Sequence, residues 1–380
     1  MTLHDLATPA VLVDQGRART NIDRMQAAAD ATGVRLRPHS KTHKSPVVAR
    51  WQLARGAAGI CCAKLGEAEV FADAGVADIR LPYPLQPVNA PRVLALLDRT
   101  RLSFVVDDLE VARGWSKAIG EAGREVDVLV KVDVGFHRCG IDPAREDAAA
   151  VVAEVAALPG LRFRGLLSHA GHAYHAPSEA DMASMARGEI DVLTRLAEAV
   201  QAHGVPVEEL SAGATPPARF SLAGRSALTE FRPGNYVYFD RTMVGLGAAT
   251  LDDCALTVLA TVVSATTADR VVLDCGSKTL SSDGARGFVP SPGYGAIFRD
   301  LGLPPGATSD SHLIVERLSE EHATVRVTPG SAHPRLRPGD RVRLVPNHAC
   351  VVSNLVDAAW LVDGGTVVDR LPIAARGKIQ

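Results

Sequence analysis

The chain has few aromatic residues and no excess of either charge. Phenylalanine, tyrosine and tryptophan make up 4% of its 380 residues, and 41 lysines and arginines stand against 43 aspartates and glutamates. A protein that binds nucleic acid presents a net positive surface, with aromatic side chains on which bases can stack. We therefore expect no nucleic-acid partner.

Long apolar runs and paired cysteines are absent too. No uninterrupted apolar stretch reaches the roughly 18 residues of a membrane span. The first residues lack the basic segment and apolar core of a secretory leader. The six cysteines include no CxxC pair, which favours reduced, mostly buried thiols over a disulfide framework. We expect a cytoplasmic protein without membrane contact.

The chain does contain an alternation of short apolar runs with amphipathic segments. The expected strands are residues 34–37, 59–63, 78–82, 102–106, 126–133, 163–169, 207–212 and 228–238, with helices between nearly all of them. Such alternation implies parallel strands, and eight units in roughly 200 residues predict a (β/α)8 barrel. A doubly wound sheet is the alternative, but no glycine fingerprint follows the first strand.

After about residue 251 the pattern becomes strand-like, with little helical periodicity. The expected strands are residues 256–265, 270–274, 313–318, 323–327, 340–345 and 366–371, and residues 284–306 are expected to form a long loop. A strand at residues 10–14 could be donated to this second region. We expect a barrel domain over residues 16–248 and a β-rich domain from residues 1–15 and 249–380.

A short basic run after the first barrel strand sets His39, Lys41, His43 and Lys44 close together. A lysine crowded by other cations loses its proton more readily, so Lys41 is a candidate Schiff-base nucleophile. A solvated basic face is a competing interpretation. A metal site at the two histidines would need a helix, which Pro38 makes doubtful.

In such barrels function gathers at the carboxyl ends of the strands. Lys41 follows the first strand, Arg138 the fifth and His169 the sixth. Small and hydroxyl-bearing residues at 211–215 and 232–236 follow strands seven and eight, where barrels usually bind phosphate. Either loop alone could be an ordinary turn. A Schiff-base lysine together with a phosphate cup is what pyridoxal 5′-phosphate (PLP) requires.

Four motifs in chain order resemble the D-threonine aldolase and D-serine dehydratase family. They are PHSKTHK at residues 38–44, VDVGFHRCG at 132–140, RPGNY at 232–236 and PNHAC at 346–350. That family is related to alanine racemase and combines a PLP-binding barrel with a C-terminal β-domain. The resemblance covers essentially the whole chain.

The resemblance implies a role for each candidate site residue. The cofactor would be bound by Lys41 as the Schiff-base lysine, Arg138 at the phenolic oxygen, His169 on the pyridine ring, Arg232 at the ring nitrogen, and Thr215, Gly234 and Asn235 at the phosphate. His175 would take the proton of the substrate's β-hydroxyl.

A divalent metal is implied as well, held by His348 and Cys350. In a strand-like context two residues this far apart point to the same face, although such a pair alone is weak evidence. Imidazole with thiolate favours zinc over manganese or magnesium.

The expected enzyme is a PLP- and metal-dependent lyase that cleaves D-3-hydroxy amino acids to glycine and an aldehyde. The alternative is a D-serine or D-3-hydroxyaspartate dehydratase that releases ammonia. An amino-acid racemase or a non-catalytic PLP carrier is less favoured. Residues 59–64 and 318–322 look closer to the aldolase branch, whereas Cys350 is more familiar from dehydratases. The resemblance also implies a small amino-acid substrate and a homodimer.

Overall fold

The computed structural model describes residues 1–288, 291–330 and 332–380. It divides into two compact units. The barrel unit comprises Arg24–Lys41, Val48–Gly234 and Gly377–Gln380, and the β unit comprises Met1–Asp23, Thr42–Val47 and Asn235–Arg376. The domain boundaries expected at residues 15/16 and 248/249 stay a prediction.

The barrel unit contains an eight-stranded parallel sheet, as the alternating pattern predicted. Its spatial order is β2-β9-β8-β7-β6-β5-β4-β3. The strands are β2 (Arg35–Leu36), β3 (Ile60–Cys61), β4 (Asp78–Pro84), β5 (Arg101–Val106), β6 (Val126–Lys131), β7 (Leu161–Leu167), β8 (Glu209–Ala212) and β9 (Glu230–Phe231). Hydrogen bonds from Ala58 N to Leu36 O and from Cys61 N to Pro38 O, both 2.8 Å, join the two end strands and close the barrel.

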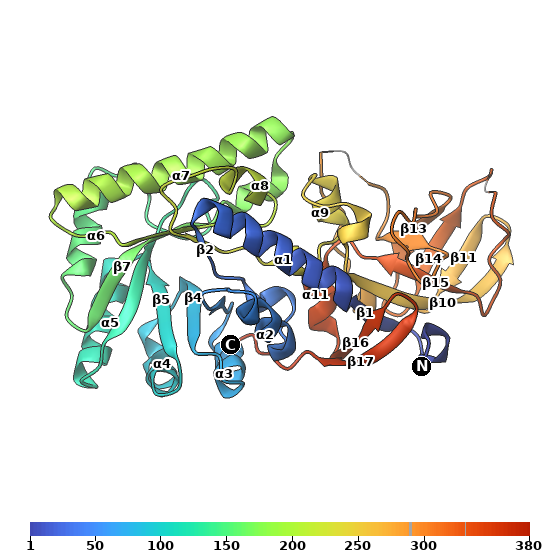
Figure 1. Cartoon of the computed structure of the whole chain (residues 1–380), viewed down its shortest axis with the longest axis horizontal. Helices are drawn as coiled ribbons and strands as arrows, with labels where there is room; N and C mark the ends of the chain where they lie inside the picture. The colour runs from blue at the N-terminus through green and yellow to red at the C-terminus, as the bar shows by residue number, and fades with distance from the viewer. Residues whose placement is uncertain (289–290, 331) are drawn as a thin grey trace. The chain divides into compact units, whose positions relative to one another are not determined.

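Helices follow the strands and cover the outside of the curved sheet, as Figure 1 shows for α3 to α7. Two of these helices begin at a capping side chain. The Asp108 carboxylate accepts a hydrogen bond from Val111 N, and the Ser178 hydroxyl accepts one from Asp181 N. The helices are α1 (Gln15–Thr32), α2 (Pro46–Ala54), α3 (Leu65–Asp73), α4 (Ala90–Leu97), α5 (Leu109–Glu121), α6 (Ala148–Ala156), α7 (Glu179–Ala202) and α8 (Ala218–Ser221).

The β unit is built on a mixed nine-stranded sheet. Its strands are β1 (Ala10–Asp14), β10 (Leu256–Thr267), β11 (Arg270–Leu273), β12 (Ala296–Phe298), β13 (Leu313–Leu318), β14 (Ala323–Val327), β15 (Arg341–Val345), β16 (Ala358–Asp363) and β17 (Thr366–Pro372). Three short helices accompany them: α9 (Arg241–Gly245), α10 (Ser277–Leu280) and α11 (Ala349–Leu355). β1 pairs with β10 and β16, which confirms that the first strand is donated to this sheet.

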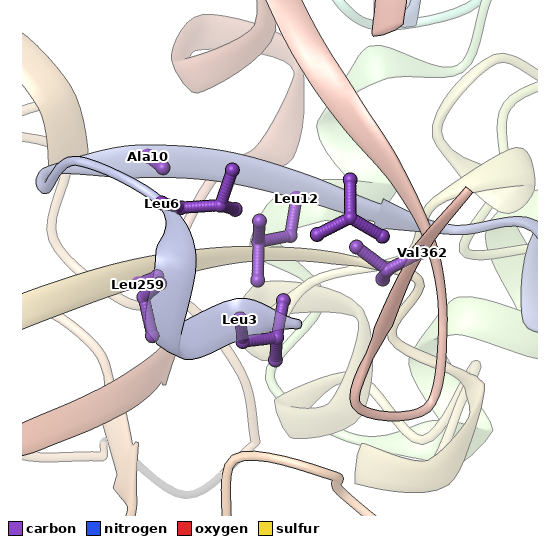
Figure 2. Packing of buried hydrophobic residues seen from close by; sticks show 7 residues of the cluster. Leu3, Leu6, Ala10, Leu12, Leu259 and Val362 are labelled. Atoms are coloured by element: carbon purple, nitrogen blue, oxygen red, sulfur yellow. The ribbon is translucent and has the colours of Figure 1, made fainter. Parts of the chain in front are cut away.

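An apolar cluster ties the start of the chain to the β unit. Figure 2 shows its side chains packed together between β1, β10 and β16. The buried members are Leu3, Leu6, Ala10, Leu12, Leu259, Val362 and Val367. Burying apolar surface is the main stabilising contribution here, at about 25 cal/mol per Å² removed from water.

Two expectations for the second half were wrong. Residues 284–306 are not one loop, because β12 lies within them and pairs with β15; residues 289 and 290 lie outside the described residues. The sequence analysis also missed β16, whose alanine-rich run looked weakly strand-like. Pairing with β1 on one side and β17 on the other stabilises it.

Among the residues that the structure describes, no helix is long and apolar enough to cross a membrane. The six cysteines are free thiols, four of them buried and Cys139 and Cys350 partly exposed, which confirms the expected reduced state.

Candidate active site

Lys41 lies just beyond the carboxyl end of β2. The chain leaves this strand with a hydrogen bond of 2.9 Å from His39 N to Pro233 O, beside Gly234. The next residues form a single 3₁₀ turn, Ser40–Thr42. The buried Ser40 hydroxyl fixes that turn by donating to Cys61 O at 2.8 Å, while Lys41 is exposed. The Lys41 amine is thus presented on a turn that the Ser40 hydrogen bond holds.

His169 follows β7 and is held by the loop after β8. Its Nδ1 lies 3.0 Å from Gly213 O. Burial, together with the charges of Lys41 and Lys131, lowers the pKa of His169 well below its ordinary value. The imidazole is therefore neutral at pH 7, and because a carbonyl only accepts, Nδ1 carries the proton. The ring is oriented without carrying a charge.

The loop after β6 is organised by one carboxylate. Asp133 Oδ1 accepts hydrogen bonds of 2.9 to 3.0 Å from the backbone N–H groups of Gly135, Phe136 and His137. The guanidinium of the exposed Arg138 lies 5.1 Å from the centroid of the Phe136 ring. That ring in turn meets His169 edge-on, with centroids 6.0 Å apart. Phe136 thus connects two of the predicted cofactor residues.

Arg232 directly follows β9 and is 5% exposed. Its Nε donates to the Ser211 hydroxyl at 2.7 Å, and its Nη2 donates to the backbone carbonyl of Ser168. Burial lowers the pKa of Arg232, but an arginine starts so high that it stays charged. A fixed cation therefore lies at the carboxyl ends of β7, β8 and β9.

The loop after β8 packs closely against the end of β9. Gly213 has a φ of +131°, and a Cβ there would come within 2.8 Å of Arg232 N, so only glycine fits. Thr215, two residues on, is 2% exposed. The missing Cβ at Gly213 lets this loop pack closely against Arg232 and the Phe231 ring of β9.

Lys131, at the end of β6, is a buried amine whose Nζ has no hydrogen-bond partner among the described residues. Burial and the charge of Arg232 lower its pKa to about 7. The buried Lys131 amine and the fixed Arg232 guanidinium thus place two cationic donors near each other at this end of the barrel. These residues fit an anionic, phosphate-bearing cofactor such as PLP.

His348 and Cys350 lie at the start of a helix, not in a strand. His348 is the N-cap residue of α11, and Cys350 lies in its first turn. The strand-like context expected for the pair was therefore wrong, because the chain turns into a helix directly after β15. The two side chains still meet, through a hydrogen bond that couples their charges.

The coupling favours a thiolate. Burial acts to lower the pKa of His348, but the hydrogen bond and charge of Cys350 outweigh burial and raise it to about 10. Burial acts to raise the pKa of Cys350, and His348 more than offsets this effect. Thr42 Oγ1 and Asn235 Nδ2 lie 3.2 and 3.6 Å from the sulfur. A thiolate is the form in which cysteine binds a metal.

His348 also has a carboxylate partner that the sequence did not reveal. Its Nδ1 lies 2.5 Å from Asp283 Oδ2, 65 residues earlier in the chain. Metal-binding histidines commonly donate their second ring nitrogen to a carboxylate. Within the described ranges no group of three or more potential ligand side chains is assembled. The imidazole and the thiolate are donor types that suit a divalent metal such as zinc.

The remaining predicted residues are more scattered. His175 is exposed at the end of the 3₁₀ helix Gly171–His175. Asn235 is buried, and its amide donates to Asp240 Oδ2 at 2.6 Å. Sequence analysis gave no role to Asp133 or Asp283 and placed Ser211 only in the expected phosphate loop; of the first two, only Asp133 carried a signal, as a carboxylate followed by a glycine turn.

Two protein-family models match this chain, one over its N-terminal part and one over its C-terminal part. Residues 13–242 match the family described as alanine racemase, N-terminal domain, and residues 255–362 match the putative serine dehydratase domain. D-threonine aldolase of Arthrobacter sp. is 36% identical, covering 97% of this chain and 93% of that protein. D-threo-3-hydroxyaspartate dehydratase of Delftia sp. (strain HT23) is 35% identical, covering 92% of each.

A solved structure is also similar to this chain over nearly its whole length. It is a D-threo-3-hydroxyaspartate dehydratase variant in the metal-free form, with a cysteine replaced by alanine. It has a TM-score of 0.89 at 32% identity, covering 98% of this chain and 99% of that chain. The chain therefore belongs to the family that joins an alanine racemase N-terminal domain to a serine dehydratase domain, and that includes D-threonine aldolase and D-threo-3-hydroxyaspartate dehydratase.

Proposed function

We propose that this chain is a PLP-dependent lyase that cleaves D-3-hydroxy amino acids, such as D-threonine, to glycine and an aldehyde. The observation that carries the proposal is the gathering of Lys41, neutral His169 and fixed Arg232 at the carboxyl ends of the barrel strands, where the charges of Lys41 and Arg232 both act on His169. The 36% identity to a D-threonine aldolase over nearly the whole chain supports it.

The cofactors supply the chemistry that side chains lack: PLP accepts the electron pair of the bond broken at Cα, and a divalent metal polarises the β-hydroxyl. Lys41 would hold PLP covalently, with Arg138 at its phenolic oxygen and His169 against its ring. Arg232 would face the ring nitrogen. Thr215, Gly234 and Asn235 would hold the phosphate.

On the β unit, His348 and Cys350 would hold the metal, and Asp283 would fix the imidazole. A thiolate ligand favours zinc. We assign His175 as the base that takes the β-hydroxyl proton, because the resemblance implies this role and the histidine is exposed at the end of the 3₁₀ helix after β7. A homodimer is proposed from the family resemblance, and light scattering in solution tests it.

A second candidate is dehydration, in which Lys41 takes the Cα proton and the β-hydroxyl leaves, giving a keto acid and ammonia. One observation favours it. The metal-free structure described above is a cysteine-to-alanine variant of a dehydratase, and this chain also carries a cysteine as a candidate ligand, Cys350.

The test is product analysis. The protein loaded with PLP is incubated with D-threonine or D-threo-3-hydroxyaspartate, before and after chelation and zinc addition. We expect glycine and acetaldehyde from D-threonine, only with metal present. A keto acid plus ammonia would replace the first candidate with the second, and turnover that survives complete chelation would contradict both.

The assignment of Lys41 as the Schiff-base lysine is tested in a separate experiment. Borohydride reduction in the presence of PLP is expected to label the peptide that contains Lys41, and Lys41→Ala should abolish the label. Lys64→Ala is the matched control, because Lys64 follows β3 at the same end of the barrel, with its Nζ 5.4 Å from the centroid of the Tyr83 ring. Labelling that persists in Lys41→Ala contradicts the assignment.

A further inference from the structure

An ion network lies buried inside the barrel unit, and Glu230 is its centre. Glu230 Oε1 accepts from Arg80 Nη1 at 2.6 Å, and Oε2 accepts from Arg37 Nε at 2.6 Å. Arg80 also contacts Glu209 at 2.9 Å, and Arg37 contacts Asp78 at 2.5 Å. Glu230 is completely buried. The charged side chains around this β9 carboxylate therefore come from β4, from β8 and from the residue that follows β2.

This carboxylate is ionised. Burial acts to raise the pKa of Glu230, but the charges of Arg80 and Arg37 outweigh burial and hold it well below its usual range. An ionised carboxylate can only accept hydrogen bonds. The contact of 2.6 Å between Ser211 Oγ and Glu230 Oε1 must therefore use the serine hydrogen.

The direction of that bond fixes the next one. A serine hydroxyl has a single hydrogen, and once it points at Glu230 the oxygen lone pairs remain for Arg232 Nε, 2.7 Å away. Because Ser211 is donating to an anion, its oxygen is also a stronger acceptor. Arg232, Ser211 and Glu230 thus form a chain of hydrogen bonds with one possible polarity.

We propose that Ser211 and Glu230 are positioning residues that hold Arg232 against the ring nitrogen of PLP and so set how strongly the bound cofactor draws electrons. The proposal rests on the proposed function, which places Arg232 at that nitrogen. A cation held there disfavours a proton on the nitrogen. If Ser211 is removed, Arg232 keeps its Nη2 bonds to backbone carbonyls but loses its Nε acceptor, and the guanidinium can turn away.

The experiment compares PLP binding and absorbance in Ser211→Ala, Ser211→Thr and Glu209→Gln. In Ser211→Ala we expect the dissociation constant for PLP to rise about tenfold, the effect of losing one hydrogen bond to a charged group. The pH titration of the bound-PLP absorbance should shift as well. Ser211→Thr keeps the hydroxyl and should restore both readouts. Glu209→Gln changes a carboxylate that contacts Arg80 but not Ser211, and should leave the titration unchanged.

A double-mutant cycle shows whether Ser211 acts through Arg232. In an Arg232→Ala background, Ser211→Ala should change the dissociation constant less than twofold. The inference is overturned if Ser211→Ala matches the wild type in both readouts, or if its tenfold effect persists without Arg232. Glu230→Gln should shift the titration in the same direction as Ser211→Ala if it folds, and the serine variants decide the question if it does not.

Failure of the proposed function is distinguishable. If wild-type protein forms no PLP adduct at Lys41, the function and this inference both fall. If the adduct forms but Ser211→Ala changes neither the dissociation constant for PLP nor the pH titration of its absorbance, only the inference is overturned.

Discussion

At the residue scale, Asp133 shows how one side chain prepares the site before any ligand arrives. It accepts three backbone N–H groups in a row, and its Oδ2 contacts His137 Nδ1 at 3.1 Å. Residues 135–137 of the loop that carries Phe136 and Arg138 are therefore held by a single carboxylate, while Asp107 Oδ2 accepts from Gly140 N further on. Positioning of this kind lowers the entropy cost of binding.

We predict that Asp133→Ala speeds amide hydrogen exchange at residues 135–137 and weakens PLP binding, because three donors lose their acceptor. Asp133→Asn keeps an oxygen acceptor, so its amide exchange rates and its PLP affinity should lie between those of Asp133→Ala and the wild type. Exchange measured by mass spectrometry on peptides covering 130–140 reads this directly. Equal exchange in all three proteins would show that the loop is held by other contacts.

Residues that join distant parts of the chain lay beyond sequence reasoning. The places of Lys41, Arg138 and His169 after barrel strands could be predicted from the alternating pattern, whereas their roles at the cofactor stay a prediction from the family resemblance. Ser211 reads as a turn residue, and its role becomes visible only when Glu230 is seen 2.6 Å away. Asp283 lies in an irregular segment 65 residues before His348, where no periodicity relates the two.

At the element scale, the opposite end of the barrel is fastened by charge. Asp127 on β6 is 3% exposed at its side chain and contacts Arg101 on β5 at 3.0 Å and Arg162 on β7 at 2.5 Å. Burial acts to raise the pKa of Asp127, but the hydrogen bonds and charges of these arginines lower it below its ordinary value. One carboxylate thus joins three neighbouring strands.

We predict that Asp127→Asn destabilises the protein by about 1 to 2 kcal/mol at pH 7, the usual worth of charged hydrogen bonds that are partly exposed. Because the folded-state pKa is depressed, this stability is present above the unfolded value of about 3.9 and is lost as pH falls through the folded value. The gap between variant and wild type in urea unfolding should therefore shrink below about pH 4.

The matched control is Asp98→Asn, which removes an exposed pair with Arg124. It should change the unfolding free energy by less than about 0.5 kcal/mol at either pH. An equal loss of unfolding free energy in Asp127→Asn and Asp98→Asn would mean that burial of the Asp127 carboxylate does not strengthen its ion pairs.

Long periodic elements of the barrel could be predicted from the sequence, whereas short ones in the β unit could not. Helix α5 and strand β6 have full apolar faces, so their patterns alone indicate them. β16 is stabilised by its pairing with β1 and β17. The helix α11 begins because the chain turns at His348, directly after β15. The interpretation of His348 and Cys350 as strand residues failed for that reason.

At the scale of the whole molecule, metal binding should stabilise the fold by mass action. At a free zinc concentration 100 times the dissociation constant the gain is about 2.7 kcal/mol, which raises Tm. We predict that zinc raises the Tm of the chelated wild type but not of His348→Ala or Cys350→Ala. Cys139→Ala, a cysteine of the barrel unit, is the control and should respond like the wild type. An equal shift in all four would indicate binding elsewhere.

The sheet pairings also impose an order on biosynthesis. β2, which leads to Lys41, pairs through Arg35 with Glu230, nearly two hundred residues later, and β1 pairs with β16 near the end of the chain. A ribosome adds about 5 to 20 residues per second, so the lysine strand waits on the order of 10 to 40 s for its partner. The nascent chain therefore acquires its cofactor-binding end late, and the first strand made is among the last to be enclosed.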